Sequence, residues 1–163
     1  MIVVSGGQTG VDRAALQAAV ALGLAHGGWV PRDGWAEDRP QPPGICADFP
    51  ELRPTPSAGP VERTEWNVRD SDRTLILVGP GGLVASPGTA ATLRFARRLD
   101  RPALVVPVDA ADTATRIAAW LPGATSGLVL NVAGPRESEA PGIQAAAEAL
   151  LRHALTRFAM PAG

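Results

Sequence analysis

The sequence predicts an α/β fold: an open, mainly parallel sheet with helices on both faces, in a single domain over residues 1–163. Short apolar segments alternate along the chain with longer segments of helical periodicity, as in successive strand–helix–strand units. Residues 73–79 are apolar on both faces, as a strand inside a parallel sheet has to be. A length of 163 residues suits one domain with its own core, and we find neither an internal repeat nor a domain boundary.

The N-terminal part contributes two strands and one helix before a long irregular stretch. The strands are expected at residues 1–5 and 28–31. The helix begins at Thr9 or Asp12, because these two residues have the spacing of a capping box, and it ends at about Leu24. Proline, glycine and charged residues dominate from 32 to about 60, so we expect an ordered but irregular segment there. Its length favours a role in function or partner contacts, because long structureless loops are uncommon in compact domains.

The C-terminal part alternates helix and strand. Its expected elements are helix 63–69, strand 73–79, helix 86–99, strand 103–107, helix 112–121, strand 127–132 and helix 141–158. Ser86 is the expected N-cap of its helix, and Pro87 occupies the first turn. The last helix carries an apolar stripe from Ile143 to Phe158, which indicates that one of its faces is buried.

The composition excludes several classes of function. The net charge of −1 and the 19% of charged residues give no reason to expect binding to nucleic acid or to a membrane surface. No apolar run approaches membrane-spanning length, and the start is unlike a signal peptide, so we expect a cytoplasmic protein. With Cys46 as its one cysteine and only His26 and His153 as histidines, the chain predicts neither an internal disulfide nor a closed metal site.

All 15 basic residues are arginine, and the chain has no tyrosine. The lack of lysine excludes a Schiff-base enzyme and a P-loop nucleotidase with its phosphate-binding lysine. The lack of tyrosine excludes acid–base chemistry by a phenol. Anions therefore have to be bound by arginine, whose planar guanidinium suits bidentate contacts with phosphate, or by backbone amides.

Four of the five expected strands lead into loops that are rich in glycine, arginine or amide side chains. These loops are residues 5–13, 31–33, 79–92 and 131–138. Each could be an ordinary turn, because turns collect the same residue types for backbone reasons. Four such loops at one edge of a sheet favour a shared ligand site, since ligands of open α/β sheets bind outside the carboxyl ends of the strands.

Two of these loops predict anion binding at a helix N-terminus. In the first, a strand runs into glycines and then directly into a helix whose first amides lack intrahelical partners. Its Gly-Gly-Gln-Thr-Gly lacks the spacing of a dinucleotide fingerprint. In the second, capping alone explains Ser86 and Pro87 but not the following Gly88 and Thr89.

Residues 63–72 place many polar groups just before a buried strand. Arg63 and Asn67 are four residues apart and share a helix face. A solvated face is one interpretation. Because Trp66 is apolar and the stretch enters the sheet, the other interpretation is that some of these polar groups are partly buried and paired.

Five segments, taken together, resemble the molybdenum carrier family, which is related to molybdenum cofactor carrier proteins. They are Ser-Gly-Gly-Gln-Thr-Gly-Val-Asp-Arg-Ala-Ala-Leu (5–16), 28–32 with 36–38, Arg-Thr-Glu-Trp-Asn-Val-Arg-Asp-Ser-Asp (63–72), Gly-Thr (88–89) and Leu-Asn-Val-Ala-Gly-Pro-Arg-Glu-Ser (130–138). They follow the family's order over nearly the whole chain, and the first and third are long and specific.

The resemblance implies a Rossmann-like fold of the group that includes the Lonely Guy phosphoribohydrolases. It also implies a carrier of the molybdopterin form of the molybdenum cofactor, a flat pterin with a phosphate and a molybdenum-oxo head. Carried over by position, the residues that hold the phosphate are Gly6, Gly7, Gln8, Thr9 and Gly10. The pocket is completed by Arg63, Asn67, Gly88 and Thr89, with Ser86 beside them. The residues expected to contact the head group are Arg32, Asn131 and Arg136. No catalytic residue, metal ligand or catalytic cofactor is expected.

The same resemblance, with the apolar last helix and the sheet edges, implies a homo-oligomer, either a dimer or a tetramer. The expected partners are a small phosphorylated ligand and a molybdoenzyme that accepts it.

The chain departs from the pattern of these relatives at two places. The phosphoribohydrolases carry a catalytic glutamate just after Gly-Thr, whereas Ala90-Ala91-Thr92-Leu93 follows here, which disfavours glycosidic hydrolysis by that mechanism. The family's tyrosines in the central segment are also absent, with Phe49 as the aromatic residue there.

Two alternatives stay open. One is a nucleotide-processing enzyme or sensor in which Glu37, Asp38, Glu65 or Asp72 supplies a carboxylate. The other is a regulatory nucleotide-binding subunit. The fold alone does not separate them from a carrier, because it hosts many functions.

Overall fold

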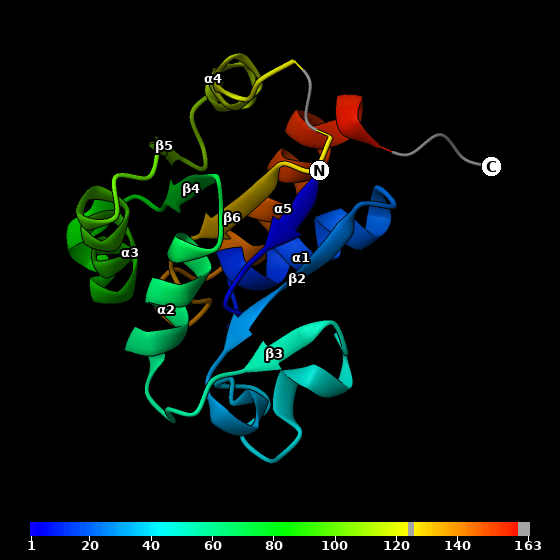
Figure 1. Ribbon diagram of the computed structural model, residues 1–163. Coiled ribbons are helices and arrows are strands. Elements are labelled where there is room, and N and C mark those ends of the chain that lie inside the picture. The colour runs from blue at the N-terminus through cyan, green and yellow to red at the C-terminus, as the bar shows by residue number, and fades with distance from the viewer. Residues whose placement is uncertain (124–125, 160–163) are drawn as a thin grey trace.

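The computed structural model describes residues 1–123 and 126–159, and it confirms the α/β class (Figure 1). Six parallel strands form one sheet in the order β3-β2-β1-β6-β4-β5. The strands are β1 (Ile2–Val4), β2 (Ala25–Val30), β3 (Leu52–Pro54), β4 (Arg73–Val78), β5 (Ala103–Pro107) and β6 (Val129–Ala133). The first strand lies between β2 and β6, so the first and last strands of the chain are neighbours in the middle of the sheet.

Five α-helices cover the two faces of the sheet. They are α1 (Val11–Ala21), α2 (Pro60–Arg69), α3 (Pro87–Arg98), α4 (Thr113–Trp120) and α5 (Ile143–Leu155). α5 packs against both α1 and α4 on one face, whereas α2 packs against α3 on the other (Figure 1). Among the described residues, no helix is long and apolar enough to cross a membrane.

The main core lies between the sheet and the layer of α1 and α5. It contains fully buried residues of the central strands, such as Leu75, Leu77 and Leu130, and the apolar stripe of α5 that includes Leu151. The large apolar residues of this stripe meet small ones on α1, so that the two helices pack closely. The stripe predicted for the last helix is therefore its packing face.

The segment after β2 contains structure that the sequence analysis did not predict. It has two short 3-10 helices, Arg32–Gly34 and Gly44–Ala47, and the edge strand β3. A second, smaller core with Leu16 of α1 and Ile45 holds it against the sheet. β3 was missed because it has only three residues, ends in proline and buries Leu52 alone, so it shows neither alternation nor an apolar run.

Both caps that we expected differ in detail. Gly10, not Thr9, is the N-cap of α1, and the side chains of Thr9 and Asp12 bond elsewhere instead of forming a capping box. Ser86 is the N-cap residue of α3, but its hydroxyl makes no bond to the helix backbone. In both loops the polar side chains contact other segments at the sheet edge.

The order of the strands reverses beside β1. From β1 the chain moves outward to β2 on one side, whereas β4 leads to β5 on the other. The loops after β1, β4 and β6 therefore converge at the carboxyl edge of the sheet, where open α/β sheets bind their ligands.

Candidate functional site

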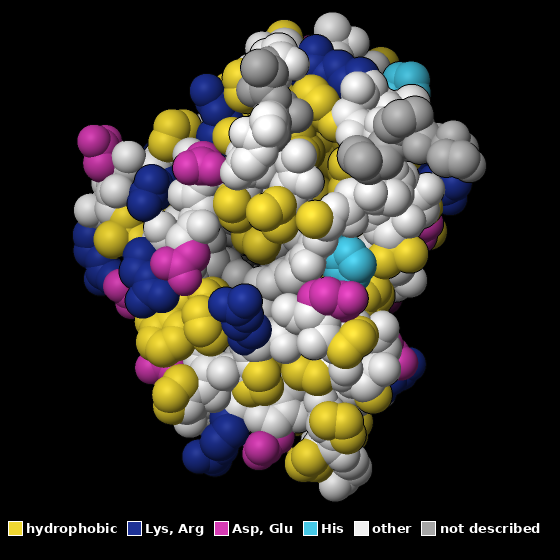
Figure 2. All heavy atoms as spheres, turned by 45° about the vertical axis from the view of Figure 1, so that its right-hand side comes forward, with side chains coloured by type: hydrophobic (Ala, Val, Ile, Leu, Met, Phe, Trp, Pro, Cys, Tyr) yellow, Lys and Arg dark blue, Asp and Glu magenta, His cyan; other side chains and the backbone are white. Residues whose placement is uncertain are grey.

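The loops after β1, β4 and β6 enclose a cavity of about 360 Å³ together with the first turns of α2 and α3. We call it the polar hollow. Its polar side chains are Gln8, Asp12, Arg63, Thr64, Ser86, Thr89, Thr92, Arg136 and Glu139. On the face drawn in Figure 2, basic and acidic side chains are interspersed, and neither sign of charge forms a large patch.

A buried ion pair forms the floor of the hollow. Nη1 of Arg63, on α2, lies 2.9 Å from Oδ2 of Asp12 in the first turn of α1. The two side chains are 12% and 6% exposed, so water screens the pair weakly. Gly6 makes the pairing possible, because a Cβ on this residue would overlap the Arg63 guanidinium. The Nε atom of Arg63 is buried and has no hydrogen-bond partner among the residues that the structure describes.

The Asp12 carboxylate is stabilised by several donors. Burial raises the pKa of Asp12 above its usual value and outweighs the charge and hydrogen bond of Arg63 and the backbone amides of Gln8 and Gly134, all of which act to lower it. Amides of the glycine loop and of the loop after β6 therefore point at a carboxylate of the protein itself. Asp12 thus engages the amide of Gln8, which belongs to the loop predicted to hold the phosphate of a ligand.

The rest of the glycine loop is packed against other segments. A Cβ on Gly7 would meet Val30 at 3.0 Å, and one on Gly10 would overlap the Pro135 carbonyl oxygen. The hydroxyl of Thr9 accepts the Glu137 amide at 3.2 Å and donates to Glu37. These residues thus lie beneath the hollow and hold it together.

Gln8 differs from its neighbours because it lines the hollow. Its side-chain oxygen accepts the amides of Thr9 at 3.0 Å and of Glu37 at 2.9 Å. It therefore also ties the glycine loop to the segment after β2.

The start of α3 forms the second wall. The Ser86 hydroxyl donates to Glu139 at 2.9 Å and lies 2.7 Å from the Thr89 hydroxyl, so Thr89 is the donor in the latter bond. A Cβ on Gly88 would meet nothing within 4 Å, so the helix is open to the hollow at this residue. As at every helix start, the first amides here are free of intrahelical partners and carry the positive end of the helix dipole.

The loop after β6 forms the third wall and contributes one cation and one anion. Arg136 is half-buried and lines the hollow, and its backbone amide donates to Glu139 at 3.0 Å. The Glu139 carboxylate thus connects this loop to Ser86. Two arginines and two carboxylates, Arg63 and Arg136 with Asp12 and Glu139, make the hollow close to neutral.

Besides Gly6, Gly7, Thr9 and Gly10, which do not line the hollow, three more residues that we expected at the site lie outside it. Arg32 is 60% exposed, pairs with Asp33 at 3.8 Å and lines a separate surface pocket. Asn67 uses its whole side-chain amide on the backbone N–H and carbonyl of Trp29, both at 2.8 Å. Asn131 is buried within the sheet, where its amide meets the Thr74 hydroxyl at 3.4 Å.

The sequence analysis missed both carboxylates of the hollow. Asp12 carried a signal as an acidic residue in a helix first turn, but 51 residues separate it from Arg63, and spacing along the chain does not predict that pairing. Glu139 lies in an irregular loop and is brought to Ser86 only by the order of the strands. Among the described residues, no group of three or more His, Cys, Asp or Glu side chains is placed to hold a metal ion.

Comparison with known proteins covers all of these loops. The model of the circularly permutated YpsA SLOG family matches residues 3–155. Among solved structures, the chain is similar to the crystal structure of a protein from Syntrophus aciditrophicus SB that is named "Putative molybdenum carrier protein". The two are 38% identical, the match covers 94% of each chain, and the TM-score is 0.81. No protein of curated function matches the chain.

Proposed function

Because the chain belongs to the circularly permutated YpsA SLOG family, we propose that it carries a small phosphorylated ligand whose oxyanion binds in the polar hollow. The ligand in this proposal is the molybdopterin form of the molybdenum cofactor, held for storage or for delivery to a molybdoenzyme. The name of the similar Syntrophus protein supports this choice. We also propose that the whole chain acts as one binding domain and that it self-associates.

One observation carries the proposal: the guanidinium of Arg63 is fixed by Asp12 at 2.9 Å and keeps a buried N–H at Nε without a partner. A buried donor without a partner is costly and requires an explanation, and in this proposal the oxyanion of the ligand is the partner of Nε. The start of α3, with its free amides and the hydroxyls of Ser86 and Thr89, offers further donors to the same hollow.

The balance of charges suits reversible binding. Asp12 and Glu139 offset Arg63 and Arg136, so an oxyanion would be held mainly by hydrogen bonds and the helix dipole, not by a large net charge. The Glu139 carboxylate shares the Ser86 hydroxyl at 2.9 Å, and a bound oxyanion would compete with it for that donor. A carrier needs such moderate affinity, because it has to release its cargo.

The nucleotide-processing alternative receives less support. The position after Gly88-Thr89 that holds a carboxylate in the phosphoribohydrolase pattern holds Thr92 here, and Thr92 lines the hollow. The two carboxylates in the hollow are already engaged, Asp12 by Arg63 and Glu139 by Ser86.

The test uses purified protein, molybdenum cofactor and an apo-molybdoenzyme whose activity reports delivery. We expect the wild-type protein to bind and protect the cofactor and to raise the yield of active enzyme. Arg63→Lys keeps a positive charge beside Asp12 but removes the Nε donor. Loss of a hydrogen bond from a charged group costs about 1.5–3 kcal/mol, so affinity should fall roughly 10- to 100-fold.

The matched control is Arg94→Lys, because Arg94 is exposed on α3 and does not line the hollow. The control should bind like the wild type. If wild-type protein neither protects the cofactor nor changes reconstitution, the proposed function is wrong.

A further inference from the structure

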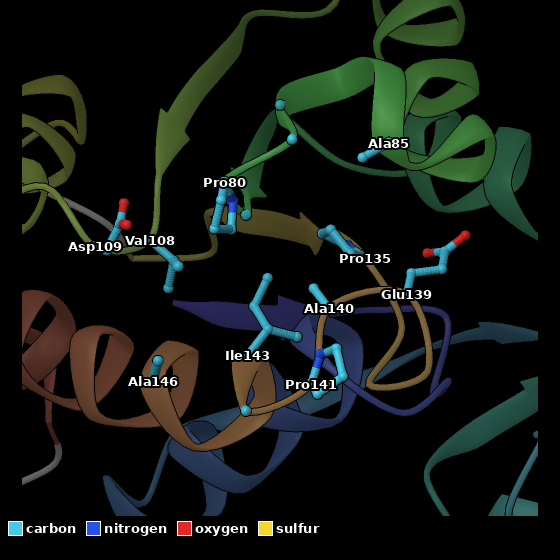
Figure 3. A pocket seen from close by; sticks show the side chains of 14 residues that line it. Pro80, Ala85, Val108, Asp109, Pro135, Glu139, Ala140, Pro141, Ile143 and Ala146 are labelled. Atoms are coloured by element: carbon cyan, nitrogen blue, oxygen red, sulfur yellow. The ribbon is translucent and has the colours of Figure 1, made fainter.

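A second cavity lies next to the polar hollow, at the carboxyl ends of β4 and β5 and the start of α5 (Figure 3). Its volume of about 480 Å³ is within the usual range for small-molecule sites. Most of its side chains are apolar, among them Pro80, Val108, Ala140 and Ile143. We call it the apolar cavity.

The two cavities share two loops and one residue. In the loop after β4, residues 79–85 contribute to the apolar cavity, whereas residues 86–92 contribute to the polar hollow. In the loop after β6, Glu139 lines both. The 2.9 Å hydrogen bond from Ser86 to Glu139 therefore lies where the cavities meet. Glu139 is exposed, so its side chain can turn aside for a ligand that reaches from one cavity into the other.

The two cavities differ in charge. The described residues that line the apolar cavity include no arginine, so no guanidinium is available to an oxyanion there. They include one carboxylate besides Glu139, that of Asp109 after β5, and Figure 3 shows these two at opposite ends. A neutral, flat ring that presents N–H groups at its far edge would match this arrangement of an apolar body and a terminal acceptor.

We propose that the two cavities are one binding site, in which the apolar cavity holds the ring of the phosphorylated ligand and Asp109 accepts two N–H groups of a 2-amino-4-oxo edge. This rests on the proposed function, which puts the phosphate in the polar hollow. Pterin and guanine rings share this edge, with an amino group beside a ring N–H, and two parallel donors match a carboxylate as the guanidinium of arginine does. Adenine has a ring nitrogen with a lone pair beside its amino group, so it offers the exposed Asp109 carboxylate one donor and one repulsive acceptor and should bind more weakly.

The experiment titrates the full-length protein with 6-hydroxymethylpterin monophosphate and follows the fluorescence polarisation of the pterin. Inorganic phosphate, GMP and AMP serve as competitors. Asp109→Asn removes the charged acceptor with little change of volume, and exposed Asp112, which does not line the cavity, gives the control Asp112→Asn. Ala146→Trp fills the cavity from its exposed rim, and Ala145→Trp is the control on the same helix.

We expect Ala146→Trp to weaken binding of the pterin phosphate by about 10-fold or more, and Asp109→Asn, at an exposed carboxylate, to weaken it several-fold. The affinity of both variants for inorganic phosphate, measured by competition, should be unchanged, and the controls should bind like the wild type. GMP should compete better than AMP, and the relative affinities of GMP and the pterin phosphate show which of the two rings the site prefers.

Three results would overturn the inference. If Arg63→Lys weakens the pterin phosphate but Asp109→Asn and Ala146→Trp do not, the ring lies elsewhere while the proposed function stands. If AMP competes as well as GMP, Asp109 does not select the edge. Absence of binding by every phosphate probe would contradict both this inference and the proposed function. Thermal unfolding of each variant shows whether it is folded.

Discussion

Substitution of Gly6 by alanine tests the floor of the polar hollow, because its effect acts through a single contact. A Cβ at this position would lie 2.6 Å from Cζ of Arg63 and 2.7 Å from Oδ2 of Asp12 and would overlap Nη1. The φ angle of Gly6 is not in the left-handed region, so alanine brings no backbone strain. The flexible Arg63 side chain has to swing out, and the ion pair with Asp12 is lost.

The loss of stability depends on how well the buried Asp12 carboxylate is still stabilised once Arg63 has moved away. Complete removal of one partner of a buried pair typically costs about 3–5 kcal/mol. Here Arg63 regains water when it leaves, and Asp12 keeps the amides of Gln8 and Gly134. We therefore expect Gly6→Ala to lower the free energy of unfolding by roughly 2–3 kcal/mol.

Gly88→Ala is the matched comparison. This glycine lies in the first turn of α3, and a Cβ on it would meet nothing within 4 Å. Gly→Ala at a compatible position stabilises by about 0.4–1 kcal/mol, mainly by restricting the unfolded chain. The same substitution should thus have opposite signs at the two glycines.

Urea unfolding followed by circular dichroism at neutral pH measures both effects. The deficit of Gly6→Ala should shrink as the pH falls, because without Arg63 the pKa of Asp12 rises further and the folded variant takes up the proton more readily. A Gly6→Ala protein within about 0.5 kcal/mol of the wild type would refute the reasoning, since that is the scatter of ordinary surface substitutions.

Three further predictions concern other parts of the molecule. Hydrogen bonds from Arg13 hold the pKa of Asp38 below its usual value in the folded protein. The Asp38 carboxylate therefore stabilises the fold at any pH above its pKa in the unfolded chain, and this contribution is lost as the pH falls through its lower pKa in the folded protein. Asp38→Asn should thus flatten the loss of stability below about pH 4 in urea titrations. Asn67→Ala leaves the N–H and carbonyl of Trp29 unpaired and should cost roughly 2–3 kcal/mol in the same assay; a cost below 1 kcal/mol would contradict it. Burial raises the pKa of the Cys46 thiol, so a thiol reagent should modify it more slowly at pH 7.5 in folded than in urea-unfolded protein, and equal rates would disprove this.

The fold was predictable because each long element has a local pattern. The strand Ala103–Pro107 was predicted at its observed bounds, and the helix predicted over 141–158 appears as α5 (Ile143–Leu155) followed by a 3-10 turn. Apolar runs and 3.6-residue periodicity reflect burial of one element at a time. β3 has no such pattern, since it depends on its pairing with β2 and on the contact of Leu52 with Leu16.

The site was predictable only in part. Loops at the ends of strands could be identified, and residues such as Arg63 and Ser86 do line the hollow. The sequence analysis could not distinguish polar side chains that are available to a ligand from those that form hydrogen bonds within the protein. Asn67 and Arg63 share a helix face and were both predicted to line the site, but the Asn67 side chain forms a hydrogen bond with the backbone of β2. Such a difference depends on contacts between segments that are far apart in the chain.

The pairing of β1 with β6 has a consequence for synthesis on the ribosome. Of the six strands, β1 is translated first. Its neighbour β2 lies close to it in sequence, but its other neighbour, β6 (Val129–Ala133), and the helix α5 that packs on α1 are translated much later. The apolar side chains of β1 and α1 that belong to the main core, such as Val3 and Ala18, thus stay exposed until β6 and α5 have been translated, whereas Leu16 is covered earlier by residues up to Leu52. Such a nascent chain is prone to aggregation and is a natural client for chaperones that bind emerging hydrophobic segments.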